Sequence, residues 1–431
     1  MLPTSRLFII WLLGFISGFN IMISGNTLNY WLASENIPLQ TIGIFAFITL
    51  PYSINFVLAP IFDTVRIKYL DKIFGHRLSW ICLISISLVL STYFLSLINL
   101  KNDLLLFGIT ALIISFFSAI QDTILSAFRT EIVSKEAVGF TSGIYIFGYR
   151  IGMLLAGSGA IYLSIYLTFN EIYKIFAGLV LIHSILLILA ARYASLCYDR
   201  HCEQQKTTRQ SRKTIKILRI LLDCFDELHC NSSRNYKQNN INLLSFIALI
   251  LAFLILYRLP DNFINVMINP FLLHLGYDAF EIASVGKFFG IIGAMVGGLL
   301  GGFIMKKKDI ISSMLFFGII HALAHILFII LEIYGKNSAL LFITIGAESI
   351  TGGMTMTVYI AFISSLCHGK FRATQYSFLS SMMGISRSIF PVISGYIVVK
   401  FGWQNFFFFA TIITIPSLLM LLKIKTKLQN I

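Results

Sequence analysis

The chain has 431 residues, of which 57% are hydrophobic and only 12% are charged, and it carries a formal net charge of +14. Soluble globular proteins contain roughly 45–50% apolar and about 25% charged residues. This composition excludes an ordinary soluble enzyme, a disordered tail and a fibrous repeat, and it predicts a protein whose main solvent is lipid.

Twelve stretches are long and apolar enough to cross a bilayer, which takes about 20 residues of helix. Because a chain in lipid must satisfy its own backbone hydrogen bonds, each stretch is predicted to be a helix. In chain order the predicted spans are 7–33, 41–61, 78–98, 104–128, 138–168, 172–194, 241–273, 279–305, 310–334, 338–366, 373–399 and 403–422.

The basic residues are distributed unevenly over the predicted loops. With the N-terminus inside, the inner segments carry 25 of the 33 Lys and Arg residues. The outer loops carry four, which are Lys101, Lys174, Lys336 and Lys400. This bias is the positive-inside pattern of membrane proteins, so we expect cytoplasmic N- and C-termini. It also accounts for the net charge without a nucleic-acid partner.

Residues 195–240 form a long polar stretch that separates six spans from six. We therefore expect an N-terminal six-helix bundle at 1–194, a cytoplasmic linker at 195–240 and a C-terminal six-helix bundle at 241–431. Within the linker, 211–228 could form an amphipathic helix at the inner membrane face. The cysteines and histidines of the linker match no standard zinc spacing, so we expect neither a metal nor a cofactor. Two six-span halves are typical of secondary transporters, whose site lies between the halves.

Ionisable residues inside the predicted spans are the first candidates for function, because a charge in lipid is costly unless it faces a cavity or a partner. These residues are Asp122, Arg150, Arg258, Asp261, Lys287, Glu348 and Arg387. The cations Arg150, Lys287 and Arg387 outnumber the nearby carboxylates and would suit an anionic solute.

The acidic residues in the spans have more than one interpretation. Asp122 and Glu348 could carry protons, because burial favours the protonated form of a carboxyl group. Arg258 and Asp261 lie three residues apart on one helix face and could simply neutralise each other.

Two further pairs of polar residues leave structural and functional interpretations open. Arg129 and Glu131 lie at the inner end of span 104–128, where a gate or a packing ion pair is expected. His321 and His325 lie four residues apart on span 310–334, where they would either pack or relay protons.

The segment LPYSINFVLAPIFDTVRIKYLDKIFGHR resembles the helix 2–3 signature of the major facilitator superfamily, in the version found in AmpG-type muropeptide permeases. The residues that match are Pro51, Tyr52, Ala59, Pro60, Asp63, Gly75 and Arg77. Asp63 and Arg77, at inner helix ends, could form a breakable clamp between helices.

A second block, SAIQDTILSAFRTEIV, resembles the helix 4 block of the same family. The matching residues of this block and of the next span are Gln121, Asp122, Ala127, Arg129, Thr130, Glu131, Gly148, Tyr149, Arg150 and Met153. In the second half, the segment LYRLPDNFINVMINPFLL, Lys287 and the region around Gln375 also fit the family. The chain departs from it at Ser126, where the family has a second carboxylate, and at Arg258, where it often has Lys.

The resemblance implies an all-α integral membrane protein with twelve transmembrane helices in two six-helix bundles, the major facilitator fold. It implies proton-coupled import of anhydro-muropeptides, which are cell-wall breakdown products, into the cytoplasm by alternating access. We expect a monomer in the bacterial inner membrane. Two alternatives remain: a divergent paralogue that transports another anionic metabolite, and a membrane sensor that binds its ligand without moving it. An enzyme is not expected, because the chain shows no catalytic triad or HExxH motif.

These interpretations assign three groups of residues. Solute binding is assigned to Gln121, Arg150, Arg258, Asp261, Lys287, Gln375 and Arg387. Proton coupling is assigned to Asp122 and Glu348, and gating to Asp63, Arg77, Arg129 and Glu131. No residue is assigned to catalysis or to a metal.

Overall fold

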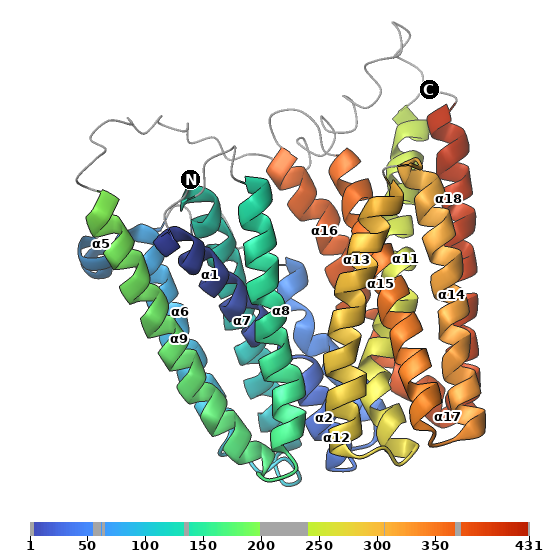
Figure 1. Ribbon diagram of the computed structural model, residues 1–431, viewed down its shortest axis with the longest axis horizontal. Helices are drawn as coiled ribbons and strands as arrows, with labels where there is room; N and C mark the ends of the chain where they lie inside the picture. The colour runs from blue at the N-terminus through green and yellow to red at the C-terminus, as the bar shows by residue number, and fades with distance from the viewer. Residues whose placement is uncertain are drawn as a thin grey trace, which may run out of the picture. The chain divides into compact units, whose positions relative to one another are not determined.

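The regular structure of the described chain is helical throughout (Figure 1). The computed structural model describes residues 4–54, 62, 65–132, 138–198, 240–305, 307–366 and 372–429. The expectation of an all-α membrane protein is confirmed for these ranges. The expected linker helix at 211–228 lies outside the described residues.

Contacts along the chain define two compact units, which we call the first unit (residues 1–31 and 57–212) and the second unit (residues 32–56 and 213–431). The helices of the first unit are α1 (Thr4–Ile23), α5 (Lys68–Phe74), α6 (His76–Leu95), α7 (Leu104–Ile132), α8 (Val138–Leu163) and α9 (Phe169–Tyr198). Helix α2 (Asn26–Ser34) runs from the first unit into the second. The bundle boundaries expected at 194 and 241 stay a prediction.

The second unit begins with the short elements α3 (Leu39–Phe45) and η1 (Ala46–Thr49). Its remaining helices are α11 (Asn240–His274), α12 (Ala279–Glu281), η3 (Ile282–Phe289), α13 (Gly290–Met305), α14 (Ile310–Tyr334), α15 (Ser338–Leu366), α16 (Arg372–Ser388), η4 (Phe390–Ile393), α17 (Ser394–Ile412) and α18 (Thr414–Gln429).

Ten helices among the described residues are long and apolar enough to cross a membrane. A shorter apolar helix covers Leu39–Ile54, and the helical stretch Phe378–Thr426 covers the expected span 403–422 and most of the expected span 373–399. Gly402, with φ 80° and ψ 170°, interrupts the helical backbone between these two spans. The helices are therefore consistent with the twelve expected spans.

In the first unit, glycines let α1 and α8 approach until their backbones touch. A Cβ atom on Gly148 would lie 2.1 Å from the carbonyl oxygen of Trp11, and one on Gly152 would lie 2.2 Å from that of Phe15. Small residues allow this close packing in lipid, where dispersion and backbone contact replace the hydrophobic effect. Arg150 lies between the two glycines, so the contact fixes its position on α8.

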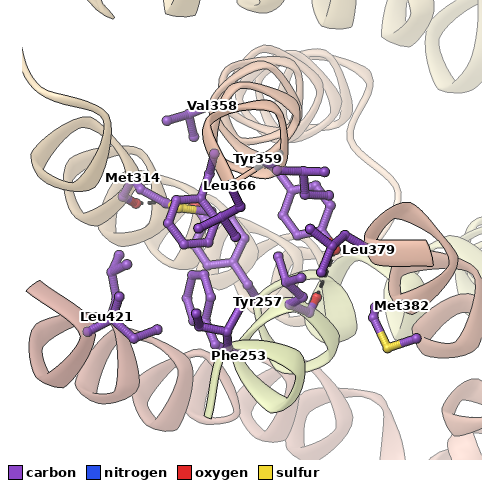
Figure 2. Packing of buried hydrophobic residues seen from close by; sticks show 14 of the residues in the cluster. Phe253, Tyr257, Met314, Val358, Tyr359, Leu366, Leu379, Met382 and Leu421 are labelled. Atoms are coloured by element: carbon purple, nitrogen blue, oxygen red, sulfur yellow. Dashed lines mark hydrogen bonds between the residues drawn. The ribbon is translucent and has the colours of Figure 1, made fainter. Parts of the chain in front are cut away.

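In the second unit, α11, α14, α15, α16 and α18 enclose an apolar core that includes Phe253, Tyr257 and Tyr359 (Figure 2). The hydroxyl of Tyr257 donates a hydrogen bond to the carbonyl of Met314 at 3.0 Å, which ties α11 to α14. The rings of Tyr257 and Tyr359 stack with centroids 6.2 Å apart, which ties α11 to α15. This core directly precedes the charged residues of α11.

Pro260 lies inside α11 and cannot donate a backbone hydrogen bond, so the helix must be supported from outside at this point. Ser386 of α16 donates to the carbonyl of Ile255 at 2.9 Å, and Tyr359 of α15 donates to that of Leu254 at 3.1 Å. Side chains of neighbouring helices commonly support a proline in a membrane helix in this way.

Helices α13 and α15 meet through glycines on both sides. A Cβ atom on Gly297 would lie 1.9 Å from the carbonyl oxygen of Ile350, and one on Gly353 would lie 2.2 Å from that of Ala294. The contact holds Glu348 of α15 beside the segment that carries Lys287.

Candidate functional site

The buried carboxylate of Asp261 is the centre of a charged cluster in the second unit. Arg258, one turn earlier on α11, forms an ion pair with its Oδ2 atom, and His321 of α14 contacts its Oδ1 atom through Nε2. The Nε2 atom of His325 lies 3.7 Å from the same Oδ1. The Asp261 side chain is only 5% exposed, so its neighbours rather than water balance its charge. The ion pair expected from the three-residue spacing is present.

Helix α15 brings a second carboxylate, that of Glu348, to the same region. Ser349 donates a hydrogen bond to it at 3.2 Å, and Asp261, Arg258 and Lys287 interact with it electrostatically. Lys287 lies within η3, a stretch of π-helix. Such stretches often occur at functional sites, because the extra residue per turn redirects a side chain. Four of the sequence-predicted site residues therefore lie in one region of the second unit.

Arg387 lies on α16, next to Ser386, whose hydroxyl accepts a hydrogen bond from Asn262 of α11 at 3.0 Å. Its guanidinium carbon is 5.4 Å from the ring centroid of Tyr52. The adjacent Ser388 hydroxyl is 2.8 Å from that of Thr49 and 3.3 Å from that of Ser53. The segment before residue 55 therefore helps to hold the end of α16 that carries Arg387.

In the first unit, α7 presents Gln121 and Asp122 to different partners on α1. Asp122 accepts a hydrogen bond from Ser17, and the Gln121 Oε1 atom accepts one from Asn20 at 2.5 Å. The Gln121 amide also donates to the hydroxyl of Ser85 at 2.9 Å, which links α7 to α6. This network joins three helices around Gln121.

Arg150 of α8 is half-buried. Its Nη1 atom lies 3.9 Å from the sulfur of Met153 one turn later, which is a weak contact for a guanidinium group. Ser126, where the resembling family has a carboxylate, lies one turn after Asp122 on α7 and is also half-buried.

The residues predicted to gate the inner ends of the helices are only partly described. Arg129 lies with its guanidinium carbon 4.4 Å from the ring centroid of Tyr145, and Arg77 donates to the carbonyl of Phe62 at 3.4 Å. Asp63 and the side chains of Glu131 and Gln375 lie outside the described residues. Both the clamp and the Arg129–Glu131 pair stay predictions.

Sequence reasoning left the contact of His321 with Asp261 unassigned. The spacing of His321 and His325 placed them on one face of a helix, and packing was the favoured interpretation. The structure turns that face toward α11, where both rings meet Asp261. The only available signal was a pair of histidines in an otherwise apolar span.

The Asp261–His321–His325 group gathers a carboxylate oxygen and imidazole nitrogens within 4.8 Å of one another. A divalent cation placed there would meet the guanidinium of Arg258, which already pairs with the same carboxylate. Repulsion between these charges in a buried site is strong. We therefore assign no metal to this group.

Comparisons with known proteins agree on the family. The sequence model of the family described as "Major Facilitator Superfamily" matches residues 10–347 and 313–429. A Rickettsia felis protein, provisionally named transporter AmpG 1, is 71% identical, with 100% of each chain covered. The anhydromuropeptide permease of Escherichia coli K12 is 28% identical over 99% of this chain and 81% of its own length.

A solved structure of the nucleoside transporter NupG has the same fold. It aligns with a TM-score of 0.71 at 14% sequence identity, covering 97% of this chain and 99% of the other. At this identity the likeness concerns the fold alone. The chain is a multi-pass membrane transporter rather than an enzyme, and it belongs to the AmpG-type transporters of the major facilitator superfamily.

Proposed function

We propose that this transporter imports anhydro-muropeptides into the cytoplasm together with protons, by alternating access. The observation that supports this solute is the alignment of 99% of the chain with the E. coli anhydromuropeptide permease. The buried cations match the carboxylate groups of a sugar-peptide. The positive-inside distribution of basic residues supports a bacterial inner membrane location with both termini in the cytoplasm.

The solute would be bound through Arg150, Lys287 and Arg387. All three are half-buried on helices expected to cross the membrane. The Nε atoms of Arg150 and Arg387 are buried and have no hydrogen-bond partner among the described residues. A guanidinium group with a donor to spare in a low-dielectric setting is suited to bind a carboxylate.

Gln121, Arg258, Asp261 and Gln375 would complete the binding site. The network around Gln121 fixes its amide, and the ion pair fixes Arg258. Gating is proposed for Asp63, Arg77, Arg129 and Glu131 on the sequence pattern described above.

Protons would be carried by Asp122 and Glu348. Each carboxylate has a serine hydroxyl as donor, Ser17 for Asp122 and Ser349 for Glu348. Both lie on helices expected to cross the membrane, where carboxylates commonly serve proton relays.

A second candidate is the transport of another anionic metabolite, and Ser126 favours it. This position carries no carboxylate here, so the first unit presents one acidic group fewer on α7 than the resembling family does. A different solute would use the same cations and the same fold.

The test is uptake of radiolabelled anhydro-muropeptide by cells that lack their own permease and express this chain. Uptake that a protonophore abolishes supports the proposal. Uptake that a protonophore leaves intact contradicts the coupling, and absence of uptake by protein shown to be in the membrane contradicts the solute. Competition by unlabelled anionic metabolites then separates the two candidates.

Arg387→Ala tests the solute site. A charge-assisted hydrogen bond is worth about 1.5–3 kcal/mol, so uptake is expected to fall by about tenfold or more. Lys336→Ala is the matched control, because Lys336 is a cation on the exposed loop between α14 and α15, paired with Glu281 at 2.8 Å. Equal uptake by the two variants would remove Arg387 from the site.

A further inference from the structure

Two histidines and an aspartate form a buried triad between α11 and α14. His321 contacts Oδ1 of Asp261 through Nε2, and Oδ2 of the same carboxylate pairs with Arg258. The two imidazole rings lie with centroids 4.5 Å apart at 65°. The His321 and His325 side chains are 5% and 0% exposed. Groups this deeply buried in a membrane span are retained at a cost in free energy, which points to a role in transport.

The Nδ1 atom of His321 faces the hydroxyl of Thr351, which can either donate or accept a hydrogen bond. Nδ1 lies 2.7 Å from the hydroxyl oxygen of Thr351, and that oxygen lies 2.7 Å from the carbonyl oxygen of Ala347. A threonine hydroxyl has one proton to donate and can also accept. It can therefore donate to Nδ1 of a neutral His321, or donate to Ala347 and accept from Nδ1–H of a charged one.

Both protonation states of His321 are thus fully hydrogen-bonded. In each state Nε2–H donates to Asp261, and only the proton on Nδ1 and the rotation of the Thr351 hydroxyl differ. A buried polar group is normally satisfied in one state alone, because an unmade hydrogen bond in the interior is expensive. A site that satisfies both states can take up and release a proton with little structural cost.

From this geometry we propose that His321 is a proton-carrying residue of the transport cycle, loaded and unloaded at Nδ1, with Asp261 and Thr351 as its positioning residues. The proposal rests on the transport function proposed above and adds a proton site to Asp122 and Glu348. No bond other than N–H changes. The proton enters Nδ1 from one side of the membrane and leaves to the other, and Asp261 stays ionised throughout.

The charges around His321 allow this change. Arg258 and Asp261 of α11 cancel each other, so protonation takes the group from neutral to a single positive charge. Glu348 of α15 interacts electrostatically with His325, whose ring lies beside that of His321, and Lys287 interacts with Glu348. From α11, Tyr257 also faces α14, through its bond to Met314.

The other helices packed against α14 carry their charges at a distance from His321. Lys425 of α18 reaches α14 at Ser312, with a bond of 3.2 Å. Lys400 of α17 lies over the ring of Phe401. In this proposal Glu348, through its interaction with the neighbouring His325, supplies the counter-charge for a protonated His321.

Sharing of Asp261 would couple the proton to the solute. When His321 is neutral, Arg258 is the single cation on this carboxylate. When His321 is charged, the carboxylate is shared between two cations, and the hold on Arg258 weakens. Arg258 then has more capacity to bind a carboxylate of the solute, so proton and anionic solute would bind cooperatively.

Nitrogen-15 NMR of the purified full-length protein, labelled at histidine, tests the proton site without any solute. His321→Gln identifies the His321 signals. Over the pH range in which the protein stays folded, we expect Nε2 to carry a proton throughout and Nδ1 to gain one as the solution is acidified. Nδ1 and Nε2 shifts that stay constant over this range would overturn the proposal.

Thr351 supplies a second, independent test. Thr351→Ser keeps the hydroxyl and should titrate at Nδ1 as the unmodified protein does, whereas Thr351→Val should change the titration midpoint. Identical titration of all three proteins would show that the hydroxyl does not serve both states. This comparison does not require that His321→Gln folds, because His321 is present in all three proteins.

Proteoliposomes separate coupling from binding. With anhydro-muropeptide as probe, His321→Gln should keep solute counterflow but lose accumulation driven by a pH gradient, down to the equilibrium level. His183→Gln is the matched control, because His183 is a buried histidine of the first unit whose ring packs on Phe15 and Phe19. Unchanged accumulation in His321→Gln would refute the proposal. Absence of counterflow in the unmodified protein would refute the proposed solute, while the NMR result still decides the proton site.

Discussion

Replacement of Gly297 by Ala tests whether backbone contact between α13 and α15 fixes the site in the second unit. The added Cβ atom would lie 1.9 Å from the carbonyl oxygen of Ile350 and 2.8 Å from its Cα atom. Cβ atoms essentially never come within 3.0 Å of another heavy atom, so the helices must separate by about 1 Å. The obstruction is backbone, which cannot rotate away as a side chain would.

The expected cost is the balance of two effects. Overpacking of a close contact typically costs about 1–3 kcal/mol. Ala also gains up to about 1 kcal/mol of helix propensity over Gly, which offsets part of this cost. The net expectation is therefore a destabilisation of up to about 2 kcal/mol, or about 1–3 kcal/mol relative to the same substitution at a glycine in open space. Uptake should fall as well, since the shift moves Glu348 away from Lys287.

Gly302→Ala is the matched control on the same helix, because nothing lies within 4 Å of a Cβ atom there. It should leave the protein as stable as before, or slightly more so. The assay is thermal unfolding of the purified protein in detergent, followed by uptake in cells. Equal melting temperatures for the Gly297 and Gly302 variants would show that the two helices do not meet at this point.

Two further predictions concern charges. Asp261→Asn removes the anionic partner of the buried Arg258 and should destabilise the protein by about 3–5 kcal/mol. The double variant Asp261→Asn with Arg258→Met should recover most of that loss in the same melting assay. If the double variant recovers nothing, the ion pair does not account for the loss. Asp309 caps α14 by accepting from the Ser312 backbone N–H at 2.9 Å, so Asp309→Ala should cost about 1 kcal/mol. That hydrogen bond holds the pKa of Asp309 below its usual value. The stabilisation by this cap is therefore complete above the usual pKa of an aspartate and disappears as the pH falls through the lowered pKa of Asp309. Equal melting temperatures of Asp309→Ala and the unmodified protein at neutral pH would contradict the role of the cap.

The helical spans could be predicted from sequence because their cause is local. Twenty apolar residues in lipid have one solution, and a glycine such as Gly402 ends a helix wherever the backbone needs a positive φ. The Arg258–Asp261 pair could be predicted for the same reason, since residues three apart on one helix always meet.

Contacts between helices had no local cause and could not be predicted. The spacing of His321 and His325 defined a helix face but not the helix that it meets, so the bond to Asp261 came only with the packing of α14 on α11. Lys287 was found by its charge, whereas the π-helix that directs it has no sequence signal. Gly297 is one of several glycines on its helix, and the sequence does not distinguish it from Gly302. A Cβ atom would meet the backbone of Ile350 at Gly297 but nothing within 4 Å at Gly302.

The proposed proton and solute sites can be compared by how their charged groups are paired. Around Asp261 the carboxylate and the guanidinium of Arg258 balance each other within one group, so a proton gained by His321 would add one positive charge to it. Arg150 and Arg387, like Arg258, each keep a buried Nε donor without a hydrogen-bond partner among the described residues. A cation left in that state gains most from an anionic solute, because binding supplies the missing acceptor. In the proposed mechanism Arg258 belongs to both tasks, because it keeps a buried donor of this kind and shares the Asp261 carboxylate with His321.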